Sequence, residues 1–247
     1  MAITKHKVLE PTLWKDSESL YQEVLETLLS IAWAYIDNVR CRQGLNIFNS
    51  DVLDIFIYGS STNYFYNKKS DIDICILFDM DKLKERNPDS RLQKSLTLFY
   101  YNWAMTHHCE IYGRKVDLSF EAVNSYRHKG HYRTGAMYSL LHKQWIYRPV
   151  VVSDKEFREL KKEADGIYRE ILKDFRKVKA HGFPMDEIQA LHQNIHHSKN
   201  VAHDTNIVQP ITSMYIAWRR IRNRGIMTEL ENHAIKHESE EFILKKN

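Results

Sequence analysis

Glycine and proline are scarce in this chain, with 8 Gly and 5 Pro in 247 residues. Such low numbers exclude collagen-like and low-complexity segments and make long flexible linkers unexpected. Cysteine is scarcer still: Cys41, Cys75 and Cys109 are odd in number and widely spaced. They form neither a disulfide framework nor a CxxC pair, which is typical of proteins in a reducing compartment. No repeat of fixed period occurs.

Long apolar runs are also missing. No apolar run approaches 18 residues, and the first residues, MAITKHKVLEPTLWKD, lack the apolar core of a signal peptide. These absences predict a soluble cytoplasmic protein (host cytoplasm if the source is viral) without membrane contact. The sequence contains no GxxxxGK[ST] motif, which excludes the common P-loop class of nucleotide-binding proteins.

Charge is distributed unevenly along the chain. The net charge is +4, but residues 127–247 hold 22 Lys and Arg against 15 Asp and Glu, so that the first 126 residues are net acidic. An acidic half followed by a basic half fits a carboxylate metal site beside a surface that meets polyanions. A lysine-rich, solvated helical surface is the alternative interpretation of the same pattern.

Hydrophobic periodicity changes near residue 150. The first part predicts strands that alternate with helices: a helix over 15–40, strands over 52–58, 71–78 and 115–120, and a helix from Asp89 or Ser90 to about 107. The second part predicts helices alone: from Ser153 or Asp154 to about 179, over 186–201, and over 210–224. We therefore expect two domains, residues 1–150 and 151–247.

Two acids open the strand 71–78, in the sequence Asp71-Ile-Asp73-Ile. Side chains alternate along a strand, so Asp71 and Asp73 project from one face, roughly 7 Å apart, while the isoleucines face the core. Two carboxylates at this spacing repel each other unless a cation lies between them. A hard divalent ion such as Mg²⁺ is the natural occupant.

Asp117 is the third candidate ligand. Val116, Leu118 and Phe120 are expected to face inward, which leaves Asp117 on the opposite side of its strand. If strands 71–78 and 115–120 are neighbours, Asp117 joins the other two acids. Three carboxylates can hold two metals, one lowering the pKa of an attacking hydroxyl and the other neutralising a triphosphate.

Gly59 and Ser60 end the first strand and have a matching role. A glycine after a strand allows close approach of the backbone to a phosphate, and a following helix start directs N–H groups at the anion. The Ser60 hydroxyl can add a hydrogen bond to the phosphates. Ser61 follows as a further candidate nucleotide-binding residue, or as an ordinary helix-start residue.

Together these motifs resemble a known superfamily. A Gly59-Ser60 pair, a gap of ten residues, Asp71-Ile-Asp73-Ile and a later strand with Asp117 are similar to DNA polymerase β-like nucleotidyltransferases. More narrowly, EPTLWKD, IYGSSTNYFYNKKSDIDICILFD and GHYRTGAMYSLLHKQWIYRP look like a largely uncharacterised nucleotidyltransferase family of tailed phages. The resemblance implies an α/β (α+β) fold with a small mixed sheet flanked by helices, a nucleoside triphosphate donor such as ATP, and Mg²⁺ or Mn²⁺ as cofactor.

Other segments offer weaker candidates. Arg133, Tyr138 and Lys143 lie in a polar, aromatic stretch that could touch base or triphosphate, or simply pack. The cluster WRRIRNR at 218–224 either grips phosphates of a nucleic acid or is a solvated helix face. His192 and His196 have helical metal-ligand spacing but lack a clear third ligand, and the histidines at 107–108 are expected to pack at a helix end.

The function expected from these features is template-independent nucleotidyl transfer. NMP would move from an NTP to a hydroxyl acceptor, with an RNA or tRNA end favoured over a protein side chain or small molecule, and pyrophosphate would leave. A glycosyltransferase DxD motif is the other source of paired acids, and the upstream Gly-Ser at fixed spacing argues against it. The alternative class is a non-catalytic nucleotide- or tRNA-binding protein on the same fold. The oligomeric state is left open.

Overall fold

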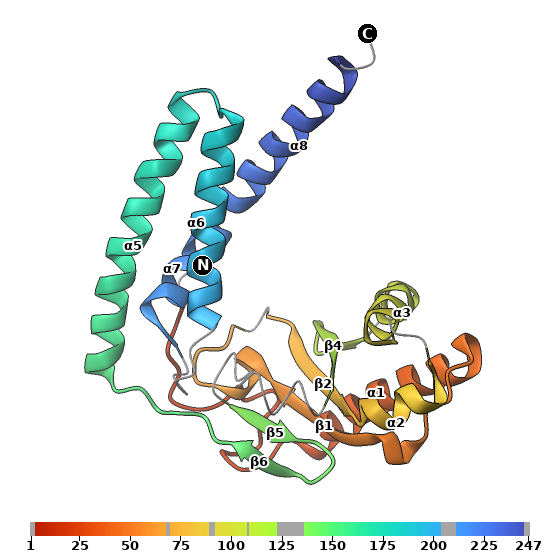
Figure 1. Ribbon diagram of the computed structural model, residues 1–247. Helices are drawn as coiled ribbons and strands as arrows, with labels where there is room; N and C mark the ends of the chain where they lie inside the picture. Colours follow the sequence, from red (N-terminus) through yellow and green to blue (C-terminus); the bar gives the residue numbers. More distant parts are fainter. Residues whose placement is uncertain are drawn as a thin grey trace. The chain divides into compact units, whose positions relative to one another are not determined.

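The computed structural model describes residues 3–67, 70–88, 92–107, 109–122, 136–203 and 211–244. These residues fall into two compact units (Figure 1). One comprises residues 4–151 and holds the strands; the other begins at Val152 and is helical. Within the described ranges, no helix is long and apolar enough to cross a bilayer.

The first unit is built on a mixed six-stranded sheet with the order β3-β4-β2-β1-β5-β6. Its strands are β1 (Val52–Tyr58), β2 (Ile72–Phe78), β3 (Glu110–Ile111), β4 (Arg114–Ala122), β5 (Met137–Ser139) and β6 (Gln144–Tyr147). β2 and β4 are parallel, and the other pairs are antiparallel. The expected fold class, a small mixed sheet flanked by helices with a helical C-terminal region, is confirmed.

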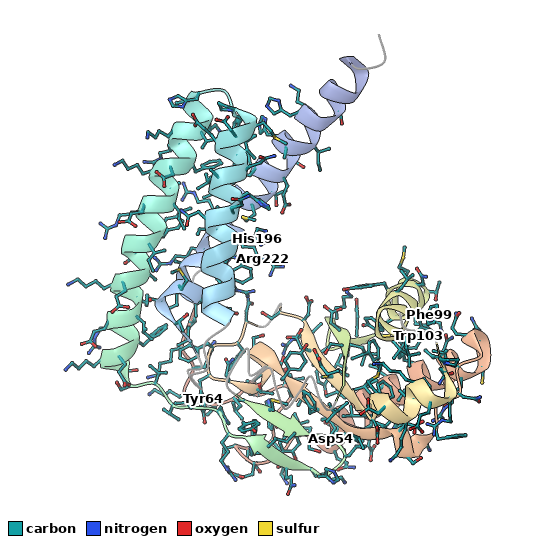
Figure 2. The ribbon with its side chains drawn as sticks, viewed as in Figure 1. Asp54, Tyr64, Phe99, Trp103, His196 and Arg222 are labelled. Carbon is teal, nitrogen blue, oxygen red and sulfur yellow. The ribbon has the colours of Figure 1, made fainter. Side chains whose placement is uncertain are left out.

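One face of this sheet carries the main core, because β-branched residues alternate along the central strands. Ile72, Ile74 and Ile76 of β2 are fully buried there. Three helices supply the other side of this core: α1 (Gln22–Gln43), α2 (Met80–Arg86) and α3 (Leu92–Thr106). Phe99 and Trp103 of α3 pack against it (Figure 2), and the nearby Tyr100 hydroxyl donates to the Val116 carbonyl of β4 at 2.6 Å.

The N-terminal helix begins later than its periodicity predicts, at Gln22 instead of near residue 15. Asp16 is the reason: its Oδ1 accepts from the backbone N–H groups of Glu18 and Ser19, both at 2.8 Å. This side chain offers the backbone a local turn in place of helical bonds. The helix ends at Gly44, which adopts φ 66°, the left-handed conformation favoured at helix C-termini.

Four short elements and one long helix were not predicted from the sequence. The strands β5 and β6 and the helix α2 are too short to produce a clear period, and β3 has only two residues. The helix α8 (Ile226–Leu244) has no wide apolar stripe. The expected start of α3 at Asp89 or Ser90 lies outside the described residues.

The helical unit contains α5 (Asp154–Ala180), α6 (Met185–His203), α7 (Ser213–Asn223) and α8, with α5 and α6 running side by side (Figure 1). The bounds of α5, α6 and α7 lie close to the predicted ones. Ser153 caps α5, accepting from the Glu156 N–H at 3.2 Å, while the Glu156 carboxylate accepts from the Ser153 N–H. This reciprocal capping box fixes the start of α5.

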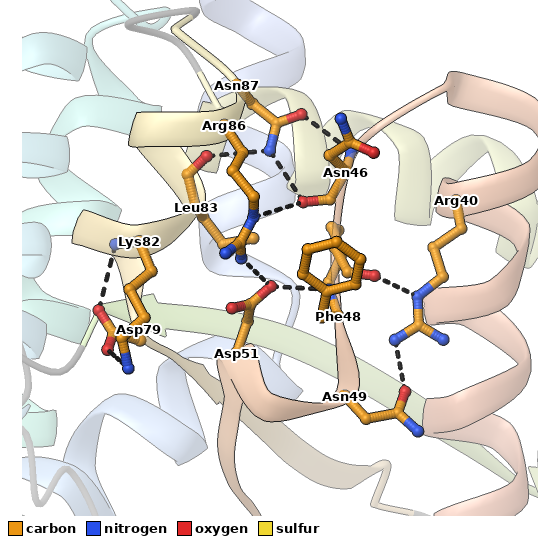
Figure 3. Close-up of polar contacts among 11 residues, drawn as sticks. Arg40, Asn46, Phe48, Asn49, Asp51, Asp79, Lys82, Leu83, Arg86 and Asn87 are labelled. Atoms are coloured by element: carbon orange, nitrogen blue, oxygen red, sulfur yellow. Dashed lines mark hydrogen bonds and ion pairs between the residues drawn. The ribbon is translucent and has the colours of Figure 1, made fainter.

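A buried polar network holds the end of the sheet where β1 begins and β2 ends (Figure 3). Asp51 is fully buried; its Oδ2 accepts from the Phe48 N–H at 2.7 Å and pairs with Arg86 of α2. The Arg86 guanidinium also lies 4.6 Å from the centre of the Phe48 ring. Asn87 accepts from the Asn46 N–H at 2.9 Å. The connection from α1 to β1 is thereby tied to α2.

Replacing Asp51 tests this network. Asp51→Ala removes the acceptor of the Phe48 N–H and leaves Arg86 without its ionic partner, so we expect the free energy of unfolding to fall by about 2–3 kcal/mol. Urea denaturation of the whole chain measures it. Asp37→Ala is the matched control, because Asp37 pairs with Arg40 but its side chain is 64% exposed; a change of at most about 0.5 kcal/mol is expected there. Equal losses in the two variants would contradict the assignment.

Candidate active site

Three strands bring their functional side chains into one row. Tyr58 of β1 is the register partner of Asp73 of β2, and Asp73 is in turn the partner of Asp117 of β4. Register partners on adjacent strands point to the same face, about 4.8 Å apart at the backbone. β2 and β4 are therefore neighbours, as the prediction for Asp117 requires. Asp73 and Asp117 lie side by side on the face opposite to the main core, and we call this pair the acid row.

A small apolar cluster lies beside this acid row on the same face. It contains Phe56, Cys75, Leu77 and Met137. The Tyr58 hydroxyl reaches over β2 and lies 3.1 Å from the Ser119 hydroxyl, which donates to the Ile74 carbonyl at 3.3 Å. Burial raises the pKa of the Cys75 thiol to about 12, so this cysteine stays protonated at neutral pH and is no nucleophile.

Asp117 is paired with a cation from its own strand. Lys115 Nζ lies 2.6 Å from Asp117 Oδ1, with the lysine side chain 52% exposed and the aspartate 35% exposed. The hydrogen bond to Asp117 raises the pKa of Lys115, with further raising contributions from the charges of Asp117 and Asp71 and an opposing one from burial. Lys115 is thus an ammonium beside the acid row at neutral pH. The sequence reasoning did not assign it a role.

Gly59 lies directly against the acid row. Its φ of 82° is one that residues with a side chain rarely adopt, and a Cβ built on it would lie 2.3 Å from Asp73 Oδ2. The glycine begins a 3-10 turn, η2 (Gly59–Thr62), whose Thr62 hydroxyl donates to the Gly59 carbonyl at 2.9 Å. The Asn63 side-chain amide donates to the same carbonyl at 3.1 Å. Gly59 therefore leaves space for the Asp73 carboxylate. The sequence had predicted a role for Gly59 at the phosphates and not this contact.

Arg114 is the residue near this site that sequence reasoning missed. It is 4% exposed; its Nε donates to the Ser70 carbonyl at 2.7 Å and its Nη2 donates to the Ser61 hydroxyl at 3.0 Å. Burial lowers its pKa, while the nearby charges of Glu10, Asp71 and Asp73 act in the opposite direction. A signal was available, because alternation along β4 places Arg114 on the core face with Val116, where a charge requires a partner.

The predicted nucleotide-binding residues fall in different places. Ser60 is half-buried in η2, whereas Ser61 is fully buried with its hydroxyl against Arg114. Tyr138 is 1% exposed and packs edge-on against Trp14 and Trp145 on the core side of the sheet. The structure does not bring Tyr138 to the acid row.

Two further candidates also lie away from the acid row or outside the described structure. Lys143 is exposed in the turn between β5 and β6. That turn follows Ser139, the partner of Phe56, and so lies toward the opposite end of β1 from Gly59. Arg133 lies outside the described residues.

The predicted metal ligands are not gathered as a closed group. In the part of the chain that the structure describes, no three His, Cys, Asp or Glu side chains are grouped so that they could hold an ion. Asp71 is exposed just before β2, and Asp117 is turned to Lys115. Mg²⁺ is often bound by only one or two carboxylates together with substrate phosphates. The row of Asp73 and Asp117 fits that open kind of site.

Several candidate residues of the helical unit make packing and pairing contacts. The rings of His192 and His196 lie 4.5 Å apart, and His192 Nε2 is 3.7 Å from Glu231 Oε1. In the basic cluster, Arg220 pairs with Asp165, and Arg222 (Figure 2) lies 5.6 Å over the Trp218 ring.

One histidine at the end of α3 also packs, as expected. His107 stacks on Trp103 with the ring centres 4.5 Å apart, and its Nδ1 lies 2.9 Å from the Trp103 carbonyl. His108 lies outside the described residues.

Comparison with known proteins agrees with this geometry. Residues 9–121 match the family model described as the central palm domain of mitochondrial-like poly(A) RNA polymerase. This part of the chain is similar to a nucleotidyltransferase palm. The match covers fewer than half of the 247 residues, but it spans Gly59, Asp71, Asp73 and Asp117. It supports the nucleotidyltransferase superfamily and does not bear on the narrower phage family. No curated protein and no solved structure matches the chain.

Gly59→Ala tests the contact between glycine and carboxylate. The new methyl group would displace Asp73, and misplacement of a reacting group by about 1 Å costs about 100-fold in rate. We expect nucleotidyl transfer to fall by about that factor in a protein that still folds, as judged by circular dichroism. Gly44→Ala is the matched control: Gly44 also has a positive φ, of 66°, but its Cβ would meet nothing within 4 Å. Similar activity loss in both variants would contradict the contact's role.

Proposed function

We propose that this protein is a template-independent nucleotidyltransferase that moves NMP from an NTP to a hydroxyl acceptor and releases pyrophosphate. The observation that carries the proposal is the register of the sheet, which sets Asp73 beside Asp117 and brings the Asp73 carboxylate over Gly59. The similarity of residues 9–121 to a poly(A) RNA polymerase palm supports the same reaction class. That similarity favours an RNA end, including a tRNA end, as the acceptor.

The acid row suits a divalent metal by its chemistry. Asp117 Oδ1 is buried, and its contact among the described residues is the ammonium of Lys115, itself a cation. Carboxylate oxygens are the ligands that Mg²⁺ and Mn²⁺ prefer. Asp71, Asp73 and Asp117 are the residues we assign to hold the ions. When bound, the ions would lower the pKa of the acceptor hydroxyl and neutralise charge on the phosphates.

The remaining work of the reaction is positioning. Gly59 leaves space for the Asp73 carboxylate, and the η2 turn that it begins offers the half-buried Ser60 hydroxyl to the phosphates of the donor. We assign Ser61 a supporting position, because its hydroxyl is buried against Arg114. Lys115 brings a positive charge to the open side of Asp117, where a triphosphate would approach. Phosphoryl transfer requires little beyond such positioning and charge neutralisation.

A non-catalytic nucleotide- or tRNA-binding protein on the same fold is the second candidate. It would use the Gly59 turn and the exposed Lys115 for binding without turnover. The row of Asp73 and Asp117 argues against it, since adjacent carboxylates repel an anionic ligand unless a metal is present. Binding of Mn²⁺ and NTP without transfer to total RNA, protein or small hydroxyl compounds would favour this candidate.

Asp73→Asn and Asp117→Asn are the direct tests of transfer. Each removes one carboxylate charge while preserving side-chain volume, so we expect transfer to drop by at least about 100-fold with an unchanged or higher melting temperature. Incubation with each radiolabelled NTP and total cellular RNA measures both the nucleotide used and the polymer labelled. Asp81→Asn, an exposed acid of α2, should retain full activity. Full activity of the doubly substituted protein would refute the mechanism.

A further inference from the structure

Arg114 lies on the core face of the sheet and connects the chain segments that carry the candidate site residues. Its backbone belongs to β4, three residues before Asp117, but its side chain lies on the core face. The guanidinium donates to the Ser70 carbonyl at 2.7 Å and to the Ser61 hydroxyl at 3.0 Å. Both bonds are within the range of strong N–H···O contacts. One side chain therefore contacts two loops that approach the site from different strands.

Each contacted group is next to a residue of the proposed site. Ser70 directly precedes Asp71, so the bond to its carbonyl fixes the backbone that enters β2. Ser61 directly follows Ser60 in the η2 turn, and its hydroxyl also lies 3.5 Å from the Asp71 carbonyl. The backbone at Asp71 and Ser60 is thus held by the planar guanidinium of Arg114, which belongs to the same strand as Asp117.

The opposite side of the guanidinium faces Glu10. Arg114 Nη1 lies 3.8 Å from Glu10 Oε2, and the two side chains are 3% and 1% exposed. The Thr12 hydroxyl donates to the other Glu10 oxygen at 3.2 Å. The backbone carbonyl of Glu10 accepts from the N–H groups of Leu13 and Trp14, both at 2.9 Å. Glu10 therefore compensates the buried guanidinium and is itself held by a turn of the N-terminal segment.

The same N-terminal segment contacts the Gly59 turn a second time. Trp14 Nε1 donates to the Ser61 carbonyl at 2.8 Å, and Trp14 is 3% exposed. Segment 9–14 thus holds Ser61 at its carbonyl, while Arg114 holds it at its hydroxyl. This accounts for the buried carboxylate of Glu10 in a segment that contributes no strand to the sheet.

We propose that Arg114, with Glu10 as its buried counter-charge, is a positioning residue that sets the spacing of Asp71, Ser60 and Asp117 for metal and nucleotide binding. The inference rests on the proposed function of these three residues. An arginine is required because its planar fork donates in several fixed directions at once, whereas a lysine ammonium is a single point on a flexible stem. The segment carrying Glu10 then belongs to the site, although it touches neither metal nor substrate.

The test compares Arg114→Lys with the intact protein in Mn²⁺ binding, followed by the electron paramagnetic resonance signal of the free ion. Lysine keeps the charge but cannot span both loops. Loss of such supporting contacts typically weakens metal affinity by about 10- to 100-fold, and we expect a weakening of that size in a folded protein. The KM for NTP should rise as well. Ser61→Ala, a much smaller change, should weaken Mn²⁺ binding in the same direction and serves if Arg114→Lys does not fold.

Arg86→Lys is the matched control, because Arg86 also pairs with a buried acid but at the opposite end of the sheet. It should lower the melting temperature without changing Mn²⁺ affinity. If Arg114→Lys and Ser61→Ala lose thermal stability but bind Mn²⁺ and NTP as the intact protein does, Arg114 is purely structural and the inference is wrong. If the intact protein binds no Mn²⁺, the proposed function itself fails, and the inference fails with it.

Discussion

The parallel pairing of β2 and β4 places Asp73 opposite Asp117. The two carboxylates repel each other, and positively charged side chains around the site offset this repulsion. Two carboxylates about 5 Å apart repel by about 3 kcal/mol at an effective dielectric constant of about 20. Such a cost is a sizeable part of the roughly 5–15 kcal/mol that stabilises a typical domain. Cations must therefore stand nearby. Lys115 contacts Asp117 from the solvent side, and the charge of Arg114 acts on Asp71 and Asp73 from the core.

The two faces of the sheet have different roles: one packs into the main core and the other carries the candidate site. On one face, Ile72, Ile74 and Ile76 pack under α1, α2 and α3 in the main core. On the other, the acid row lies next to the small apolar cluster around Cys75. Apolar neighbours lower the local dielectric constant, which strengthens the interaction of the carboxylates with any cation. Without a cation, the closeness of the two carboxylates destabilises the fold. With a cation, the same closeness makes them effective ligands.

Much of this organisation could be predicted because strand alternation is a local property. The faces of Asp73 and Asp117 follow from a period of two, and the predicted strands 71–78 and 115–120 are neighbours as β2 and β4, although β2 begins at Ile72 and Asp71 precedes it. The late start of α1 could not be read from apolar spacing, since the side chain of Asp16 competes with the helix.

Tertiary packing decided the rest. Tyr138 packs edge-on against Trp14 and Trp145, which stack on each other, and Trp14 comes from a segment far from Tyr138 in the sequence. The pairing of Glu10 with Arg114 spans most of the first unit and leaves no local pattern. Only the presence of an arginine at a core position indicated that some partner had to exist.

The alternation along Arg114-Lys115-Val116-Asp117 also limits how β4 can join the sheet. A slip of one residue would turn every side chain of the strand to the other face. Asp117 would then enter the isoleucine core, and Arg114 would leave Glu10 for the side of the sheet that carries the acid row. Lys115 and Asp117 would be buried together among apolar side chains and Arg114 would lose Glu10, so a misregistered sheet would lose its stability and its site together. Correct strand pairing during folding is thus favoured by electrostatics as well as by hydrophobic burial.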